Sequence, residues 1–220
     1  MFYFPKDSPK RGTVSDFQEW VWAKHDKKMQ EWLWYRQHPE MRSGRRQEED
    51  KENLFRMAYS KLHHDKVRIA SNVLQEIQRI NIQKSPWKVV YKDIHDDKPK
   101  NNSLNSKSLY VDDNPLRGCP DIVFENQISR EILIVETKII FVPLDMIPEE
   151  TYPNIRAQLW CYSKMGFWEE INDDLVSMVV NFWDVTLKNY RISRIWKRSD
   201  DNLNKECSDW FNAYQNLRTT

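Results

Sequence analysis

The most constraining feature of the sequence is a mostly apolar run at residues 132–142. Its two alternating sets of side chains are both mostly aliphatic, which is typical of a central strand covered on both faces of a sheet. Two charged residues, Glu136 and Lys138, interrupt one of these sets. Residues two apart in a strand project from the same face, so the carboxylate and the ammonium are predicted side by side, about 7 Å apart along the strand.

A second carboxylate is predicted beside this pair. Asp121 follows Pro120 and opens a shorter apolar stretch, and residues 125–130 are predicted to form a hairpin turn that makes the two strands neighbours. Burying an unpaired charge costs several kcal/mol, so Asp121, Glu136 and Lys138 need one another or a ligand such as a metal. The pattern predicts either a functional group of ionisable residues or a structural ion pair at a sheet edge.

A helix is predicted after the second strand, from about Asn154 to Met165, where Gly166 ends it. Gln158 and Tyr162 lie four residues apart on this helix and therefore share a face. Two interpretations of that face remain open. It is either part of a functional site, or it packs Tyr162 into the core.

The ordered combination of Pro-Asp at 120–121, a hairpin, an apolar strand, Glu-x-Lys at 136–138 and a helix carrying Gln-x-x-x-Tyr at 158–162 resembles the active-site core of the PD-(D/E)xK nuclease superfamily. The Gln-x-x-x-Tyr element resembles the RecB-like, phage-exonuclease-like branch. The resemblance covers roughly a third to a half of the 220 residues. It implies an α/β (α+β) fold with a restriction-endonuclease-like core, in which a mixed central β-sheet is flanked by helices, and here with an N-terminal helical extension.

The resemblance also implies a chemistry, namely hydrolysis of DNA by a metal-dependent, exonuclease-like enzyme. Asp121, Glu136 and the backbone carbonyl of Thr137 would bind Mg²⁺, for which Mn²⁺ can substitute, since Mg²⁺ prefers hard oxygen ligands. Lys138 would contact the attacking water or the charged transition state. An endonuclease, an RNA substrate, and one or two metal ions remain alternatives.

In the resembled branch, the face that carries Gln158 and Tyr162 contacts DNA or orients the catalytic residues. A helix before the first strand often adds an acidic metal ligand, and Glu76 is the best-placed candidate because it lies one turn from Val73 and Ile80. Other candidates for this ligand on the same predicted helical segment are Glu48, Glu49, Glu52, His63 and His64.

Three regions are predicted along the chain. Residues 1–82 form an N-terminal helical region, with helices at about 15–35 and 47–82. Residues 83–200 form the nuclease core, and residues 201–220 form a C-terminal helix that packs on it. Within the core, we expect a short strand at 87–91, a long mobile surface loop at 93–108, and a hairpin of strands at 175–185 and 190–196.

Composition narrows the function classes. No apolar run approaches the roughly 18 residues needed to span a membrane, and the N-terminus lacks the pattern of a signal peptide, so we expect a soluble, cytoplasmic protein. Three scattered cysteines argue against a disulfide framework and against a four-cysteine iron–sulfur cluster. The net charge of +1 neither favours nor excludes nucleic acid. The chain has no P-loop, so a helicase in a recombination or defence system would be a separate partner.

Two rival hypotheses accompany the nuclease. One is a catalytically inactive nuclease-like module that binds nucleic acid or protein within a larger assembly. The other is an unrelated α+β interaction protein in which Glu136 and Lys138 form a purely structural pair. The complete set of Asp121, Glu136 and Lys138 favours an active enzyme over the inactive module. The interaction protein predicts that Lys138→Met leaves the protein folded and at least equally stable, with no metal binding to lose.

Overall fold

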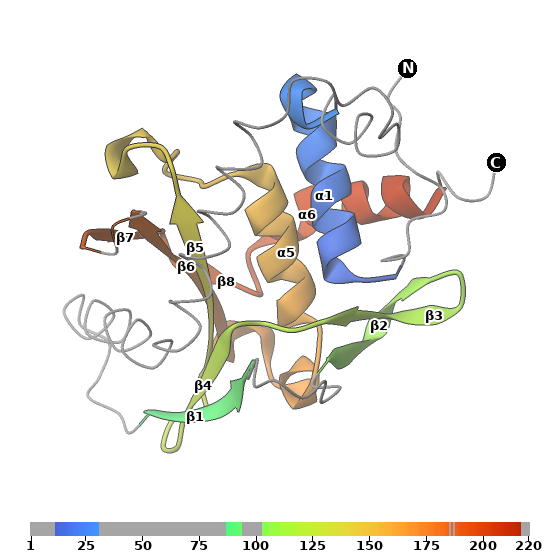
Figure 1. The fold of residues 1–220 in the computed structure, drawn as a ribbon. Coiled ribbons are helices and arrows are strands. Elements are labelled where there is room, and N and C mark those ends of the chain that lie inside the picture. Colours follow the sequence, from blue (N-terminus) through green and yellow to red (C-terminus); the bar gives the residue numbers. More distant parts are fainter. Residues whose placement is uncertain (1–11, 31–86, 94–102, 185, 187, 217–220) are drawn as a thin grey trace.

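A mixed β-sheet of six strands forms the centre of the part of the chain that the computed structural model describes, namely residues 12–30, 87–93, 103–184, 186 and 188–216 (Figure 1). The strand order is β1-β4-β5-β6-β7, and β8 pairs with β6. β5 and β6 are parallel, whereas the other neighbours are antiparallel. The strands are β1 (Trp87–Lys92), β4 (Ile122–Asn126), β5 (Ile132–Ile140), β6 (Val176–Asp184), β7 (Tyr190–Ile192) and β8 (Trp196–Lys197).

Three α-helices of the described residues lie on one face of this sheet, and a separate two-stranded sheet projects beside them (Figure 1). The protein is therefore a mixed α/β fold with a mixed central sheet flanked by helices. None of the described helices is long and apolar enough to cross a membrane. These elements are α1 (Val14–His25), α5 (Pro153–Ser163) and α6 (Asp201–Asn216), with the hairpin strands β2 (Leu104–Val111) and β3 (Asn114–Gly118).

β5 is the central strand that the apolar run predicts. Ile132 and Ile134 join the main core under the helices, and Leu133 and Val135 join a second cluster on the opposite face, so burial on both faces is confirmed. The strand is shorter than predicted. It ends where Ile140 pairs with Asp184 of β6, and the next two side chains, Phe141 and Val142, are exposed.

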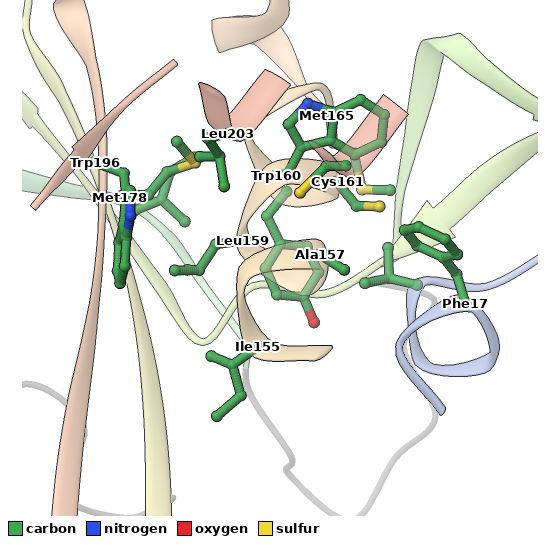
Figure 2. Packing of buried hydrophobic residues seen from close by; sticks show 14 of the residues in the cluster. Phe17, Ile155, Ala157, Leu159, Trp160, Cys161, Met165, Met178, Trp196 and Leu203 are labelled. Atoms are coloured by element: carbon green, nitrogen blue, oxygen red, sulfur yellow. The ribbon is translucent and has the colours of Figure 1, made fainter. Parts of the chain in front are cut away.

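α5 connects the parallel strands β5 and β6 and is buried almost all round. Pro153 occupies its first turn, where a missing N–H costs nothing, and Lys164 ends it just before Gly166. Figure 2 shows the helix packed between Met178 and Trp196 on one side and Phe17 of α1 on the other. A helix with neighbours on every side carries no clean apolar stripe, but the predicted position is confirmed.

The N-terminal helix is shorter than predicted. Thr13 caps it, with Oγ1 accepting the Asp16 N–H at 3.2 Å, so the helix begins at Val14, close to the predicted start at about residue 15. α1 ends at His25 because Asp26 is extended and its Oδ1 accepts the N–H of Lys28 at 2.8 Å, which starts a new helical turn at residues 27–30. The predicted single helix at 15–35 is therefore wrong, and its last five residues lie outside the described part.

α6 begins at Asp201 because the Asp200 carboxylate accepts the N–H groups of Asn202 and Leu203, both at 3.1 Å. It packs mainly against α5 and α1, and the Tyr214 hydroxyl donates to the carboxylate of Asp16 on α1. The N-terminal and C-terminal helices thus share one core with the sheet.

The prediction of a surface loop at 93–108 is wrong at its C-terminal end. Residues 104–108 belong to β2, because three groups bind the Glu169 carboxylate, 61 to 63 positions further on: the Lys107 N–H at 2.8 Å and the hydroxyls of Ser106 and Ser108. A polar sequence is ordered here by a distant partner that no local pattern reveals. Residues 94–102 and the predicted helix at 47–82 lie outside the described part.

Candidate active site

The hairpin between β4 and β5 brings Asp121 beside β5, as the sequence predicts. β4 pairs with β5 from Ile122 opposite Val135, so Asp121 lies just where this ladder stops. Its Oδ2 accepts the backbone N–H of Thr137 at 2.8 Å, and the residue is only 3% exposed. Beyond the end of β4, the Asp121 carboxylate therefore takes the hydrogen bond from β5 that a backbone carbonyl of β4 would otherwise accept.

Glu136 and Lys138 project from the same face of β5 and form an ion pair. Lys138 Nζ lies 2.8 Å from Glu136 Oε1, with side-chain exposures of 20% for the lysine and 3% for the glutamate. A pair like this contributes little net stability, since desolvation offsets most of the attraction. Its position, rather than its energy, is what makes it informative.

α5 adds Gln158 and Tyr162 to this group. Gln158 Nε2 donates to Glu136 Oε1 at 3.1 Å and to the Tyr162 hydroxyl at 2.9 Å, and both residues are buried. Gln158 Oε1 has no hydrogen-bond partner within the described ranges. The predicted shared face of the helix therefore points at the glutamate of β5.

The backbone of Thr137 offers a further oxygen to the same group. Within a strand, the N–H and C=O of one residue point to the same side, and the Thr137 N–H points at Asp121. The Thr137 carbonyl is thus directed to the Asp121 side, beyond the end of β4.

An open cleft of about 580 Å³ exposes these groups. Its other walls come from the first turns of α1 and from the segment that leads from β3 to Asp121. The side chains of three acidic and two basic residues line it within the described part of the chain, so its net charge is close to zero but negative. The charged lining residues are Asp93, Asp121, Glu136, Arg117 and Lys138.

Two of these residues, Asp93 and Arg117, were not predicted as site residues. Asp93 directly follows β1 and donates its N–H to the Asp121 carbonyl at 3.0 Å, although the sequence assigns it to a surface loop. The available signal was its place two residues after the apolar Tyr91, which puts both on one face of a strand. Arg117 lies on β3, and its backbone N–H donates to the Gly12 carbonyl at 3.0 Å. No local sequence pattern predicts that Arg117 lines the cleft.

The donor set fits a hard divalent cation, although the side chains do not enclose one as they lie. Among the described residues, no three His, Cys, Asp or Glu side chains form a group that could hold a metal ion. Asp121, Glu136 and the Thr137 carbonyl supply only oxygen, the ligand type that Mg²⁺ prefers. Glu76 and the other predicted helical ligands lie outside the described residues.

Two of the three cysteines, Cys161 and Cys207, are buried in the core between α5 and α6, away from the cleft. Burial raises the pKa of the Cys161 thiol well above its usual range, and the neighbouring Cys207 raises it further. Burial raises the pKa of Cys207 in the same way. A thiol that stays protonated in this way is an unreactive core side chain.

Comparison with known proteins adds no relative, since the sequence matches no family model and no curated protein. The fold and the site define the class: a mixed α/β protein whose central strand presents a glutamate–lysine pair to an open, charged cleft. The functional interpretation rests on that geometry.

Proposed function

We propose that this protein is a metal-dependent nuclease that hydrolyses phosphodiester bonds of DNA, with exonuclease-like activity and a restriction-endonuclease-like core resembling the PD-(D/E)xK superfamily. One observation carries the proposal. A chain of contacts joins Lys138 to Glu136, Glu136 to Gln158, and Gln158 to Tyr162, at the wall of a single cleft that Asp121 also lines.

Mg²⁺, or Mn²⁺ in its place, is the cofactor that the oxygen donors suit. Asp121, Glu136 and the Thr137 carbonyl would hold it. When bound, it supplies a Lewis acid that polarises the phosphodiester and favours ionisation of water. The side chains of the cleft would position the substrate and stabilise the developing charge.

Lys138 is proposed to stabilise the negative charge of the substrate and of the transition state. Its ammonium is held by Glu136 and is partly exposed to the cleft, so it can donate a hydrogen bond to an incoming phosphate oxygen or to the attacking water. Preorganised donors of this kind stabilise the negative charge that develops in the transition state. Gln158 holds the Glu136 carboxylate, because its Nε2 donates to Glu136 Oε1, and the same Nε2 also donates to the Tyr162 hydroxyl.

DNA is the proposed partner because the cleft is open and bears groups that suit a phosphate backbone. Arg117 is exposed at its wall, and Thr13 and Ser15 line it at the N-terminal turn of α1. Basic side chains and helix N-termini position a nucleic acid without reading its sequence. A DNA substrate also agrees with the predicted cytoplasmic location.

A catalytically inactive nuclease-like module is the second candidate. The observation in its favour is that Lys138 already satisfies Glu136 and that no metal-binding group is assembled within the described ranges. Such a module would bind nucleic acid or a partner protein through the same cleft without cleaving.

Cleavage of end-labelled linear DNA, closed-circular DNA and single-stranded RNA, each with Mg²⁺, Mn²⁺ or EDTA, separates the two candidates. We expect loss of linear DNA with either metal, none in EDTA, and none with Lys138→Ala or Asp121→Asn. Lys205→Ala, at an exposed position of α6, is the control and should cleave normally. Nicking of the circle would indicate an endonuclease. Binding of DNA without cleavage under every condition would support the inactive module.

A further inference from the structure

We propose that the outer face of the β2–β3 hairpin binds a single-stranded stretch of DNA that leads into the cleft, with Arg117 contacting a phosphate and Tyr110 stacking on an unpaired base. The inference rests on the proposed nuclease function and deepens it, because it names the form of DNA that the cleft would receive. Binding of a single strand can nevertheless be measured without cleavage.

The two faces of the hairpin differ in burial. The inner face packs on the main core through apolar side chains, which are Leu109, Val111 and Leu116. On β3, Pro115 and Arg117 are two residues apart and therefore share the other, outer face. Tyr110 pairs with Pro115, and Asn105 pairs with Arg117, so these two residues of β2 lie on the outer face as well. Asn105, Tyr110 and Arg117 are all exposed.

The side chain of Arg117 differs from those of the other described arginines. Each of the others has an ion pair or a hydrogen bond with a protein group, namely Arg130, Arg156, Arg191, Arg194 and Arg198. Within the described ranges, the Arg117 guanidinium has neither. An exposed guanidinium in this state is available to a phosphate, which it binds through two parallel hydrogen bonds.

Tyr110 stands apart from the other exposed aromatic residues in the same way. Its side chain is 44% exposed. The remaining exposed Phe, Tyr and Trp side chains of the described part each have a contact, namely Trp22, Phe141, Phe167 and Tyr190. The Tyr110 ring has none among the described residues. Such a ring offers a face on which any unpaired base can stack, because every base has a π-face.

Tyr110 and Arg117 are close enough to bind neighbouring groups of one strand. Pro115 stands opposite Tyr110, and Arg117 follows two residues later, about 7 Å further along β3. A cation for the backbone and an aromatic ring for a base form the combination by which proteins bind single strands without reading their sequence.

The outer face of the hairpin is continuous with the cleft. A hollow of about 470 Å³ runs along the hairpin, and Arg117 lines both this hollow and the cleft. From Arg117 to Asp121 the chain advances four positions, which span at most about 14 Å. Stacked nucleotides advance about 3.4 Å each along a strand. A strand held at Arg117 therefore places a phosphodiester beside Asp121 and Lys138 within a few nucleotides.

Distant segments hold the backbone at both positions. The Arg117 N–H donates to the Gly12 carbonyl at 3.0 Å, and the Gln215 side chain of α6 donates to the Tyr110 carbonyl. Glu169 holds β2 through the Lys107 N–H at 2.8 Å. The hairpin thus presents two unpaired side chains on a fixed backbone, so binding costs little ordering of the chain.

These features favour a single strand over a duplex. In a duplex the bases stack on one another, so the Tyr110 ring would find no free base. A polyanion suits the face because the basic residues that line the cleft, Arg117 and Lys138, are both at least partly exposed.

The test measures binding of a short fluorescein-labelled oligothymidylate by fluorescence anisotropy, in EDTA and over a series of salt concentrations. Tyr110→Leu should weaken binding at least about fivefold, whereas Tyr110→Phe, which keeps the ring, should bind as the wild type does. Arg117→Gln should weaken binding about threefold or more, and it should reduce the slope of log K against log salt by about 0.7, the value for one phosphate contact on a single strand.

Lys205→Gln, at an exposed position of α6, removes one positive charge elsewhere and should alter neither the affinity nor the slope. Because Tyr110 and Arg117 are exposed and make no side-chain contact in the described part of the chain, all four variants should melt at the temperature of the wild type.

The outcomes separate this inference from the proposed function. If the wild type cleaves DNA while Tyr110→Leu and Arg117→Gln bind the strand normally, the hairpin is not a binding face and the nuclease stands. If the strand binds through both residues but no DNA is cleaved with Mg²⁺ or Mn²⁺, the binding face stands and the nuclease fails. The inference also fails if the wild type does not bind oligothymidylate, if it binds a blunt duplex equally well, or if Lys205→Gln weakens binding as much as Arg117→Gln.

Discussion

The buried Arg198 and the Glu136–Lys138 pair differ in the partners of their hydrogen bonds. Arg198 is 3% exposed and directs its guanidinium entirely at protein groups: the Asp173 carboxylate at 2.6 Å, the Ser163 and Trp168 carbonyls at 2.9 Å, and the Ile171 carbonyl. The Glu136 and Lys138 pair instead lines a cleft.

The difference separates a charge whose hydrogen bonds all go to protein groups from a charge that is presented to a cleft. Arg198 ties together the end of α5 and the turns that follow it, and it offers nothing to a ligand. The pair on β5 costs desolvation without closing a network, since Lys138 remains partly exposed and the neighbouring Gln158 keeps an unused acceptor. Burial alone is therefore a poor guide to function.

The double substitution Glu136→Gln with Lys138→Met is the strongest test of whether the Glu136–Lys138 pair differs in role from Arg198. We expect cleavage to fall at least about 10³-fold, because metal and transition-state contacts are lost together. The free energy of unfolding should change by less than about 1.5 kcal/mol, since removing both charges leaves no unpaired one. Single-turnover cleavage and urea denaturation measure the two effects, with Lys205→Met as the control. Normal cleavage by the double variant would make this pair structural.

Arg198→Met should show the opposite behaviour. Three backbone carbonyls lose their donor, so we expect the free energy of unfolding to fall by about 3 kcal/mol. Cleavage per folded molecule should be unchanged. Arg194→Met is the matched control: its side chain is 42% exposed, and its ion pairs should contribute no more than about 1 kcal/mol. A fully folded but inactive Arg198→Met would contradict a purely structural role.

Gly118→Ala should affect both regions, because Gly118 lies where the core meets the cleft. An added Cβ would stand 2.7 Å from Val14 Cγ2 and 2.9 Å from Tyr162 Cε1. We expect a loss of about 1–3 kcal/mol in stability from overpacking, and slower cleavage because the Tyr162 ring is displaced from Gln158. Val14→Ala in the same chain should restore part of the stability. Denaturation and cleavage assays of the four variants in a double-mutant cycle test this coupling.

The smallest expected effect is a pH dependence confined to the helical core. Burial first, and then the neighbouring Lys24, lower the pKa of His25, whose ring lies 5.3 Å from that of Trp210. The folded state therefore binds fewer protons than the unfolded chain, and stability falls as the pH drops below the usual histidine pKa of about 6.5. Urea midpoints at pH 7.5 and 5.5 should differ less in His25→Gln than in the wild type. An equal dependence in both would exclude His25 as the cause.

The part of the site carried by one strand and its hairpin could be predicted from the sequence. The apolar run predicted a strand buried on both faces, and its period of two predicted that Glu136 and Lys138 are neighbours. The hairpin placed Asp121 next to them, and the spacing of Gln158 and Tyr162 predicted their common face. Each of these inferences depends on short-range geometry, which the backbone fixes.

Contacts between distant segments could not be predicted. Asp93 lines the cleft because β1 pairs with β4, across a gap of almost thirty residues that includes the β2–β3 hairpin. β2 itself is a polar sequence held by Glu169, so its composition indicates a loop. Asp26 ends α1 through its own carboxylate, a local event that competes with a continuing helical pattern.

The sequence by itself determined the central strand, its charged pair and the shared α5 face of Gln158 and Tyr162, because the periods of strands and helices fix which side chains share a face. Only the tertiary structure decided which walls close the cleft and that Asp93 faces Asp121. It also decided that Arg198 is saturated while Gln158 is not. Those facts depend on which surfaces meet, and burial of a shared core selects that pairing rather than any local preference of the chain.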